Sequence, residues 1–436
     1  MSEQRQPVGV IGVGWVGLVT AVCFAELGHE VVARDILAEK VEALSRGEAA
    51  IHEPGLEEML RRNAERITFT TEMPVLLDRA KLLFVCVDTP PTYSGDADLS
   101  RVRAVVDDLP TGGGHVLVMK STVPAGTGNS IRRDLPGLSY VSCPEFLKEG
   151  SAVEDFMHPD RVVIGSYPGD EDAAAAVAEL YEPLGGTILQ TDVASAEMIK
   201  LASNAFLATK ISFINEIANV CEEVGADVRE VANGMGLDER IGSSFLRAGI
   251  GYGGSCFPKD VSALKMLAGN TGYHFQLLTA VIEVNELQKR RVVGKLEKHL
   301  GSLIGKRVAL LGLAFKPDTD DMREASSLVL AARLQGEGAE VVAYDPVAAG
   351  RAGELLDSVE MAGSAMAAIE GADAVVLVTE WGEFGALDWA AAAAKMAQPL
   401  IVDGRNYLDP AALRAAGFEY EGIGRPEVAA ATATSE

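Results

Sequence analysis

The first part of the chain alternates short apolar runs with longer helical patterns. The apolar runs predict buried strands at residues 8–12, 30–35, 81–87, 114–120 and 161–165. A glycine turn follows the first of them, and residues 18–29 have the pattern of an amphipathic helix. Strands that alternate with helices predict a parallel, doubly wound sheet.

The pattern then changes and later returns. Residues 194–223 form one long helical run without Pro or Gly, apolar on nearly every face, which predicts burial on several sides. From residue 306, strands are again expected at 306–315, 340–346, 373–380 and 399–405, with a helix at 326–339. The expected fold is α/β, with two Rossmann-like doubly wound parallel-sheet domains joined by a central, all-α dimerisation domain that contains the long helix.

We place the expected domain boundaries where these patterns change. They give an N-terminal domain at 1–193, a central helical domain at 194–300 and a C-terminal domain at 301–424. The low-complexity segment 425–436 is expected to be disordered.

Composition narrows the class of protein. The 436 residues carry a net charge of −25, which argues against binding to nucleic acid or to an anionic membrane surface. No apolar run is long enough to span a membrane, and the polar N-terminus does not resemble a signal peptide. The five cysteines are scattered without a CxxC pair, which favours a reducing cytoplasm. The six histidines form no HxxxH pattern, so no metal site is expected.

The first glycine turn has the spacing of a dinucleotide-binding motif. Gly12, Gly14 and Gly17 form GxGxxG between a strand and a helix, and Asp35 ends the next strand. The glycines permit close approach of a pyrophosphate, and the acid can accept the ribose hydroxyls of NAD while it repels the 2′-phosphate of NADP. Arg34 beside it weakens the preference for NAD slightly.

The second α/β region lacks this motif and has only Gly312 in the corresponding turn. We therefore expect it to bind a different nucleotide or none. Lys316 in this turn could hold a phosphate, although a single lysine is more often a solvated surface charge.

Two further pairs of polar residues have the spacing of one helical turn. Lys200 and Asn204 share a face of the long apolar helix, where buried polar groups need partners. Cys256 follows a run of glycines and precedes Pro258, which suits the first turn of a helix, so Cys256 and Asp260 would share a face. A cysteine at a helix N-terminus is favoured as thiolate, although a small filler residue in a tight turn is the alternative.

The chain resembles the UDP-glucose/GDP-mannose dehydrogenase family over residues 8–424. The resemblance rests on motifs that occur in the family's order: GVGWVGL, KSTVPAGT, CPEFLKEGSAVEDFMHPDRVVIG, KLASNAFLATKISFINE, FLRAGIGYGGSCFPKD and GLAFKPDTDDMREASS. It implies oxidation of the primary alcohol of a sugar nucleotide to a carboxylate with two NAD⁺, through a thiohemiacetal and a thioester on a cysteine. The cysteine loop most resembles that of the enzymes acting on UDP-glucose.

The resemblance also implies roles for individual residues. Cys256 is the implied nucleophile, Lys200 and Asn204 stabilise the oxyanion, Asp260 is the base, and Thr122 and Glu145 act on the hydrolytic water. The implied cofactor-binding residues are Gly12, Gly14, Val16, Gly17, Asp35, Lys40, Thr89, Thr122, Lys259 and Arg323. The implied substrate-binding residues are Glu145, Phe146, Leu147, Lys148, Glu149, Lys200, Asn204, Arg240, Tyr252, Gly253, Lys316 and Arg405, with Arg240 reaching the substrate of a neighbouring subunit.

Several alternatives remain open at this point. Within the family, a GDP-mannose or UDP-N-acetylhexosamine dehydrogenase is the nearest alternative. A two-electron hydroxyacid dehydrogenase needs neither the cysteine loop nor a third domain, and a catalytically silent NAD sensor needs no catalytic cysteine. Cys143 departs from the Asn or Ser usual in the family, and we expect it to fill space, with a side role in oxidation sensitivity as the alternative. A homodimer or a larger homo-oligomer is expected.

Overall fold

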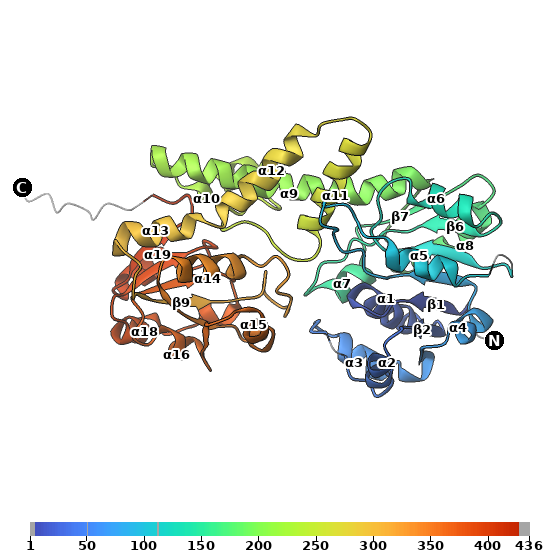
Figure 1. The fold of residues 1–436 in the computed structure, drawn as a ribbon, viewed down its shortest axis with the longest axis horizontal. Helices are drawn as coiled ribbons and strands as arrows, with labels where there is room; N and C mark the ends of the chain where they lie inside the picture. Colours follow the sequence, from blue (N-terminus) through green and yellow to red (C-terminus); the bar gives the residue numbers. More distant parts are fainter. Residues whose placement is uncertain (1–4, 50, 111–112, 427–436) are drawn as a thin grey trace, which may run out of the picture. The chain divides into compact units, whose positions relative to one another are not determined.

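The chain folds into two compact units that share the central helices (Figure 1). The computed structural model describes residues 5–49, 51–110 and 113–426, so the predicted tail lies outside the described residues from residue 427 onward. The first unit comprises residues 1–204 and 262–274, and the second comprises residues 205–261 and 275–436.

The first unit is built on one sheet with helices in most of the connections. Within the described residues its strand order is β3-β2-β1-β4-β5-β6-β7-β8. The strands are β1 (Val8–Ile11), β2 (Val31–Arg34), β3 (Ile67–Thr70), β4 (Leu82–Val85), β5 (Val116–Met119), β6 (Ser139–Ser142), β7 (Arg161–Ser166) and β8 (Thr187–Asp192). The helices are α1 (Trp15–Glu26), α2 (Ala38–Ser45), α3 (Leu56–Arg62), α4 (Met73–Arg79), α5 (Ser100–Asp107), α6 (Thr127–Asp134), α7 (Ala152–Met157) and α8 (Glu171–Tyr181).

This sheet confirms the doubly wound prediction, with one departure. The pairs from β3 to β6 and the pair β7–β8 are parallel, but β6 and β7 pair antiparallel, with Val141 opposite Ser166. An antiparallel partner begins at the edge where the previous strand ends. The segment between β6 and β7, which contains α7, therefore does not cross back over the sheet as a helix between parallel strands does.

Helix α1 also differs from its prediction. The sequence pattern predicted an amphipathic helix at 18–29, whereas α1 begins at Trp15 and every residue from Gly17 to Ala25 is buried. A helix that is apolar on all sides packs against several neighbours at once, here β1, β2, α3 and α7.

The second unit contains the second predicted sheet. Its strand order, within the described residues, is β11-β10-β9-β12-β13-β14, and every pair is parallel. The strands are β9 (Arg307–Leu311), β10 (Glu340–Tyr344), β11 (Glu360–Met361), β12 (Ala374–Leu377), β13 (Leu400–Asp403) and β14 (Glu419–Gly422). The helices that follow these strands are α14 (Ser326–Gly336), α15 (Ala349–Leu355), α16 (Ala365–Ile369), α17 (Gly382–Gly385), α18 (Trp389–Lys395) and α19 (Pro410–Ala415).

The two sheets repeat one local design at their first turn. Gly12 and Gly312 both have positive φ, at 88° and 86°, and the residue after each donates its backbone N–H to an acid at the end of the neighbouring strand. That acid is Asp35 in the first sheet and Asp345 in the second. Asp345 also accepts from three more backbone amides and from the indole of Trp381, so it is enclosed by protein donors.

The central segment is helical, as predicted. It contains α9 (Val193–Val224), α10 (Val228–Gly236), α11 (Phe257–Asn270), α12 (Gln276–Gln288) and α13 (Arg291–Leu300). The compact units divide within α9 and α11, so the domain limits at 193 and 300 stay a prediction. Helix α9 is not buried all round within the chain, because Phe206, Phe213, Val220 and Val224 are exposed.

The described residues contain neither a candidate membrane span nor a candidate metal site. No helix there is long and apolar enough to cross a membrane. In the same part of the chain, no three His, Cys, Asp or Glu side chains are grouped so that they could hold a metal ion.

The tight turn before α1 predicts a selective effect of glycine substitution. A Cβ at Gly17 would lie 1.8 Å from the carbonyl oxygen of Gly12, whereas at Gly14 the nearest heavy atom would be 3.7 Å away. Gly17→Ala should therefore destabilise the protein by about 1–3 kcal/mol or more, while Gly14→Ala should melt close to the wild type. Equal melting temperatures of the two variants in calorimetry would contradict this account of the turn.

Candidate active site

The carboxyl edge of the first sheet carries the predicted cofactor residues. Asp35 directly follows β2 and accepts from the backbone N–H of Val13 at 3.0 Å and from the Lys40 ammonium at 3.1 Å. Burial raises the pKa of Asp35, but the amides of Leu37 and Val13 together with Lys40 outweigh it, so the pKa lies below its ordinary value. The acid is therefore ionised at neutral pH and able to accept further hydrogen bonds.

The turn has the form that a dinucleotide pyrophosphate requires. Gly14 has no side chain at the start of α1, and a Cβ there would lie no closer than 3.7 Å to another group, so a pyrophosphate can approach the backbone. Val16 is half-buried in the first turn of α1, and Gly17 is buried behind it. Arg34 donates from Nε to the carbonyl of Thr71 at 3.3 Å and lies 3.8 Å from Asp108.

Thr89 and Thr122 connect two neighbouring loops at this edge. Thr89 follows β4 and Thr122 follows β5, and the two strands pair in parallel. The Thr89 hydroxyl donates to the carbonyl oxygen of Thr122 at 2.7 Å. The carboxyl ends of β1, β2, β4 and β5 thus bring the predicted cofactor residues of the first unit to one edge, where doubly wound sheets bind their ligands.

A buried ion pair lies beyond β6. The Lys200 ammonium on α9 is 2.8 Å from Oε1 of Glu145, and both side chains are at most 5% exposed. Oε2 of Glu145 accepts from the backbone N–H of Leu147 at 2.6 Å. Burial raises the pKa of Glu145, but the Lys200 ammonium and the Leu147 amide hold the pKa of this carboxyl below its ordinary value. The pair keeps a carboxylate and an ammonium charged inside the protein.

Two cations contact the ring of Phe146. The Arg161 guanidinium is 4.0 Å from its ring centroid, and the Lys200 ammonium is 5.5 Å from the same centroid. Cations over an aromatic face are attracted by the ring quadrupole. The ring therefore helps to fix the direction of Lys200, while Asn204, one turn further along α9, is also buried.

The rest of the predicted substrate stretch is more varied. Lys148 is largely exposed and pairs with Asp155, whereas Glu149 is buried. Leu147 is half-buried and packs against the core of the first unit.

In the second unit, Cys256 lies directly before the first residue of α11. The backbone N–H of Asp260 donates to the carbonyl of Cys256 at 2.9 Å, so these two residues are one helical turn apart, as predicted. The partial positive charge of a helix N-terminus favours an anion at this position. Asp260 is buried and pairs with the Lys259 ammonium at 2.5 Å, so Lys259 is placed beside the predicted base.

The loop before Cys256 is irregular but buried and well bonded. Residues 250–254 are buried, and a buried backbone needs partners for its N–H and C=O groups. Asn285 on α12 accepts from the Tyr252 N–H at 2.8 Å and donates to the Tyr252 carbonyl at 3.0 Å. The Arg405 guanidinium donates to the carbonyl of Gly251 at 3.0 Å, and also to the carbonyls of Val378 and Phe315.

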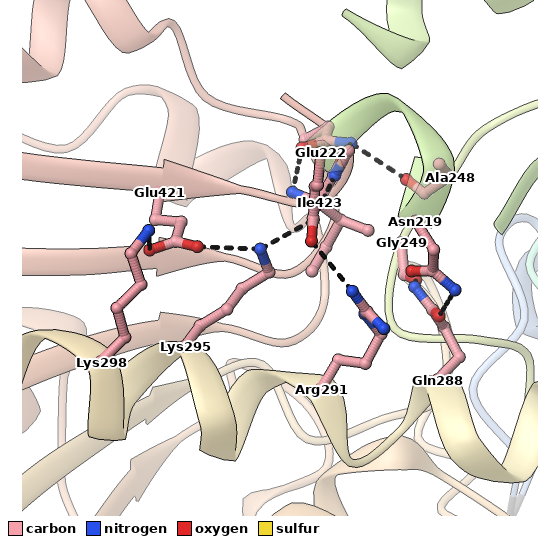
Figure 2. Close-up of polar contacts among 12 residues, drawn as sticks. Asn219, Glu222, Ala248, Gly249, Gln288, Arg291, Lys295, Lys298, Glu421 and Ile423 are labelled. Carbon is pink, nitrogen blue, oxygen red and sulfur yellow. Dashed lines mark hydrogen bonds and ion pairs between the residues drawn. The ribbon is translucent and has the colours of Figure 1, made fainter. Parts of the chain in front are cut away.

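Figure 2 shows how the start of this loop is anchored. Gln288 on α12 donates to the Gly249 carbonyl at 2.9 Å and contacts Asn219 of α9. Beside them Glu222 of α9 pairs with Arg291 at 3.0 Å and Lys295 at 2.7 Å, and Lys295 also pairs with Glu421 of β14. This network joins α9, α13 and the edge of the second sheet, next to the loop.

The glycines at the end of the loop make room for protein groups. Gly254 has φ +83°, and a Cβ there would lie 2.7 Å from the Phe315 ring. The space beside Gly254 is thus occupied by the Phe315 ring. A Cβ at Gly253 would lie 2.2 Å from the Glu324 carbonyl, and the Gly254 N–H donates to the Arg323 carbonyl.

The remaining predicted residues of the second unit have diverse surroundings. The Arg323 side chain is 59% exposed and pairs with Asp321, and Lys316 lies 5.5 Å from the Phe315 ring centroid. The Arg240 side chain is 88% exposed and contacts Asp238. Tyr252 is buried and packs edge-on against Phe257.

The predicted catalytic residues therefore form one group in each unit. Glu145, Lys200 and Asn204 belong to the first unit with Thr122, and Cys256 and Asp260 belong to the second. That the two groups act on one substrate stays a prediction. Sequence reasoning missed Asn285 and Gln288, which hold the cysteine loop from 33 and 39 residues away and give no local signal.

Exposure separates Cys256 from the other cysteines. All five lie in the described part of the chain, and Cys256 alone is partly exposed, while Cys23, Cys86, Cys143 and Cys221 are buried. Burial raises the pKa of the Cys143 thiol, which makes it a poor nucleophile and favours the expected role of a space-filling residue.

Known proteins and family models match this chain along most of its length. Residues 6–185, 194–287 and 309–410 match the NAD binding, central and UDP binding domains of the UDP-glucose/GDP-mannose dehydrogenase family. The UDP-glucose 6-dehydrogenase TuaD of Bacillus subtilis is 46% identical over 433 residues, which cover 97% of this chain and 94% of that protein.

Two solved structures are similar along their full length. A UDP-glucose dehydrogenase from Pyrobaculum islandicum is 39% identical with a TM-score of 0.89, and covers 98% of this chain and 99% of its own. A UDP-D-ManNAc dehydrogenase from Pyrococcus horikoshii is 29% identical with a TM-score of 0.85. The match covers 96% of this chain and 99% of that protein.

The buried ion pair predicts a pH-dependent effect of removing its cation. In Lys200→Met the ammonium is lost, and burial, opposed only by the smaller effects of the Leu147 amide and the Lys120 charge, should raise the pKa of Glu145 above the ordinary value near 4.5. The variant should then be closest to the wild type below about pH 4.5 and lose stability as the pH rises through the raised pKa, by about 3–5 kcal/mol at its largest.

Urea unfolding midpoints of both proteins between about pH 4.5 and 8 measure this difference. Lys148→Met is the matched control, because its pair with Asp155 has a lysine side chain that is 61% exposed, and it should show no such trend. A difference between Lys200→Met and the wild type that stays constant with pH would refute the assignment.

Proposed function

Because the chain belongs to the UDP-glucose/GDP-mannose dehydrogenase family, we propose that it oxidises UDP-glucose at C6 to UDP-glucuronate, with two NAD⁺ per sugar. Relatives called UDP-glucose 6-dehydrogenase, at 46% identity, support this substrate over the N-acetylated sugar named for the relative at 29%. The observation that carries the proposal is Cys256, the partly exposed thiol at the start of α11.

The cysteine allows both oxidation steps to occur in one site. Gly12, Gly14 and Gly17 would hold NAD⁺, which would supply the hydride acceptor for both oxidations. The Cys256 thiolate adds to the carbonyl carbon of the aldehyde, and the oxygen takes a proton to give a thiohemiacetal. Loss of a hydride and of the hydroxyl proton leaves a thioester. Water then breaks the carbon–sulfur bond, which releases the carboxylate and restores the thiol.

Further residues of both units serve charge and proton transfer in this scheme. Lys200 and Asn204 stabilise negative charge that develops on the carbonyl oxygen. Such electrostatic stabilisation is strongest in a buried site. Asp260 receives the alcohol proton, with Lys259 beside it. Glu145 remains a carboxylate because of Lys200, so it can accept a hydrogen bond from the hydrolytic water near Thr122.

The alternative functions differ in the sugar nucleotide that is consumed or in the amount of NADH that is formed. A GDP-mannose or UDP-N-acetylhexosamine dehydrogenase would form the same amount of NADH from a different sugar nucleotide. A hydroxyacid enzyme would form one NADH per substrate, and a silent NAD sensor would form none. The 46% identity over nearly the whole chain favours the four-electron enzyme.

We also propose that the protein is a homodimer or larger assembly in the cytoplasm. Phe206, Phe213 and Val220 are exposed on α9 at intervals of seven residues, so they form one apolar stripe. Exposed Leu277 and Leu287 on α12 add to the apolar surface of the second unit. The occupant we propose is a second copy, whose substrate Arg240 would reach. The five free cysteines suit a reducing compartment.

The function is tested by counting NADH. The wild type should form two NADH per UDP-glucose consumed, and should prefer UDP-glucose to GDP-mannose, UDP-N-acetylglucosamine and UDP-N-acetylmannosamine in kcat/KM. Cys256→Ser should lose steady turnover and keep NAD⁺ binding, because a hydroxyl captures the aldehyde poorly. Cys143→Ser is the control and should keep most activity. A near-normal rate for Cys256→Ser would rule out the covalent scheme.

The assembly is tested by placing a charge in the stripe. Phe213→Asp should shift the protein towards monomer in analytical ultracentrifugation, because a carboxylate in an apolar interface is costly to desolvate. Leu355→Asp on α15, a residue that is also exposed, is the control and should leave the mass unchanged. A wild type that is monomeric at micromolar concentration would refute the assembly.

A further inference from the structure

Glu53 is a buried acid that no step of the proposed reaction uses. It lies before α3 in the first unit and is 6% exposed. Its Oε2 accepts from the indole N–H of Trp15 at 3.0 Å and from the backbone N–H of Gly150 at 2.8 Å. Its Oε1 accepts from the backbone N–H of Ala152 at 2.8 Å.

The donors come from the two ligand-binding segments of this unit. Trp15 is the first residue of α1 and stands inside the glycine turn, between Gly14 and Val16. Gly150 and Ala152 directly follow the stretch 145–149, which begins at the partner of Lys200. One carboxylate oxygen is therefore shared by the turn that would hold NAD and the loop that would hold the sugar nucleotide.

The loop is built to present these amides. Gly150 has φ +81°, a conformation that favours glycine and that directs its N–H to Glu53. Three donors on one buried carboxylate are charge-assisted hydrogen bonds, and a displacement of either segment would stretch at least one of them. The position of the turn and the position of the loop are therefore not independent.

We propose that Glu53 is a positioning residue that couples the cofactor turn to the substrate loop. A ligand that orders the turn then favours the binding position of the loop, and by linkage the reverse holds with the same factor. The inference rests on the proposed function for the identity of the two ligands. It assigns Glu53 no contact with either of them.

The test removes one donor and keeps the acid. Trp15→Phe retains an aromatic ring but loses the indole N–H, while Glu53 keeps its bonds to Gly150 and Ala152. Calorimetric titration with NADH, in the absence and presence of UDP-glucose, measures the coupling without turnover, because neither ligand can oxidise the other. In the wild type UDP-glucose should tighten NADH binding by about fivefold or more.

In Trp15→Phe this factor should fall towards one, while the affinity for UDP-glucose alone stays as in the wild type. Trp389→Phe is the matched control, because its indole also donates one hydrogen bond, to the Phe384 carbonyl in the second unit, and it should keep the wild-type factor. Glu53→Ala provides a second variant, in which neither the turn nor the loop keeps its acceptor, so it must also lose coupling.

An unchanged coupling factor in Trp15→Phe, or a wild type without coupling, overturns the role of Glu53. The proposed substrate has a separate readout, the affinity of the wild type for UDP-glucose alone. Failure of the function and failure of the coupling are therefore distinguishable in the same set of titrations.

Discussion

The buried ion pair between Lys200 and Glu145 is the constraint on which the site of the first unit depends. Taking both charges out of water is costly, and the cost is offset only when the two lie close and their other atoms are bonded. The 2.8 Å contact and the Leu147 amide meet this condition. They tie helix α9 to the loop after β6, so the lysine and the carboxylate that we propose for oxyanion stabilisation and hydrolysis are positioned by the same contact.

Both units fix irregular loops in the same way. In the loops that we propose carry the chemistry, polar side chains from distant segments bond to the backbone. Asn285 and Arg405 do this for the cysteine loop, and Glu53 does it for the loop that follows Glu145. A loop held by several such bonds keeps its shape without being a helix or a strand.

The sequence predicted the features whose causes are local. The glycine turn, Asp35 at a strand end and Cys256 at a helix start each depend on a few neighbouring residues, and the structure has them. The roles of Asn285 and Glu53 depend on residues more than thirty positions away, which no spacing reveals. Periodicity also misjudged α1, because its many small and apolar residues pack against neighbours on every side, and it gave no sign that β7 runs against β6.

The enclosure of Asp345 has a consequence for protein engineering. Adding glycines around Gly312 would not by itself create a dinucleotide site at the second sheet. Asp345 already accepts from Trp381 and four backbone amides. A ribose would have to displace donors that hold the turn together. Asp345 therefore holds the turn of its own sheet, whereas Asp35 accepts from two backbone amides and the Lys40 ammonium.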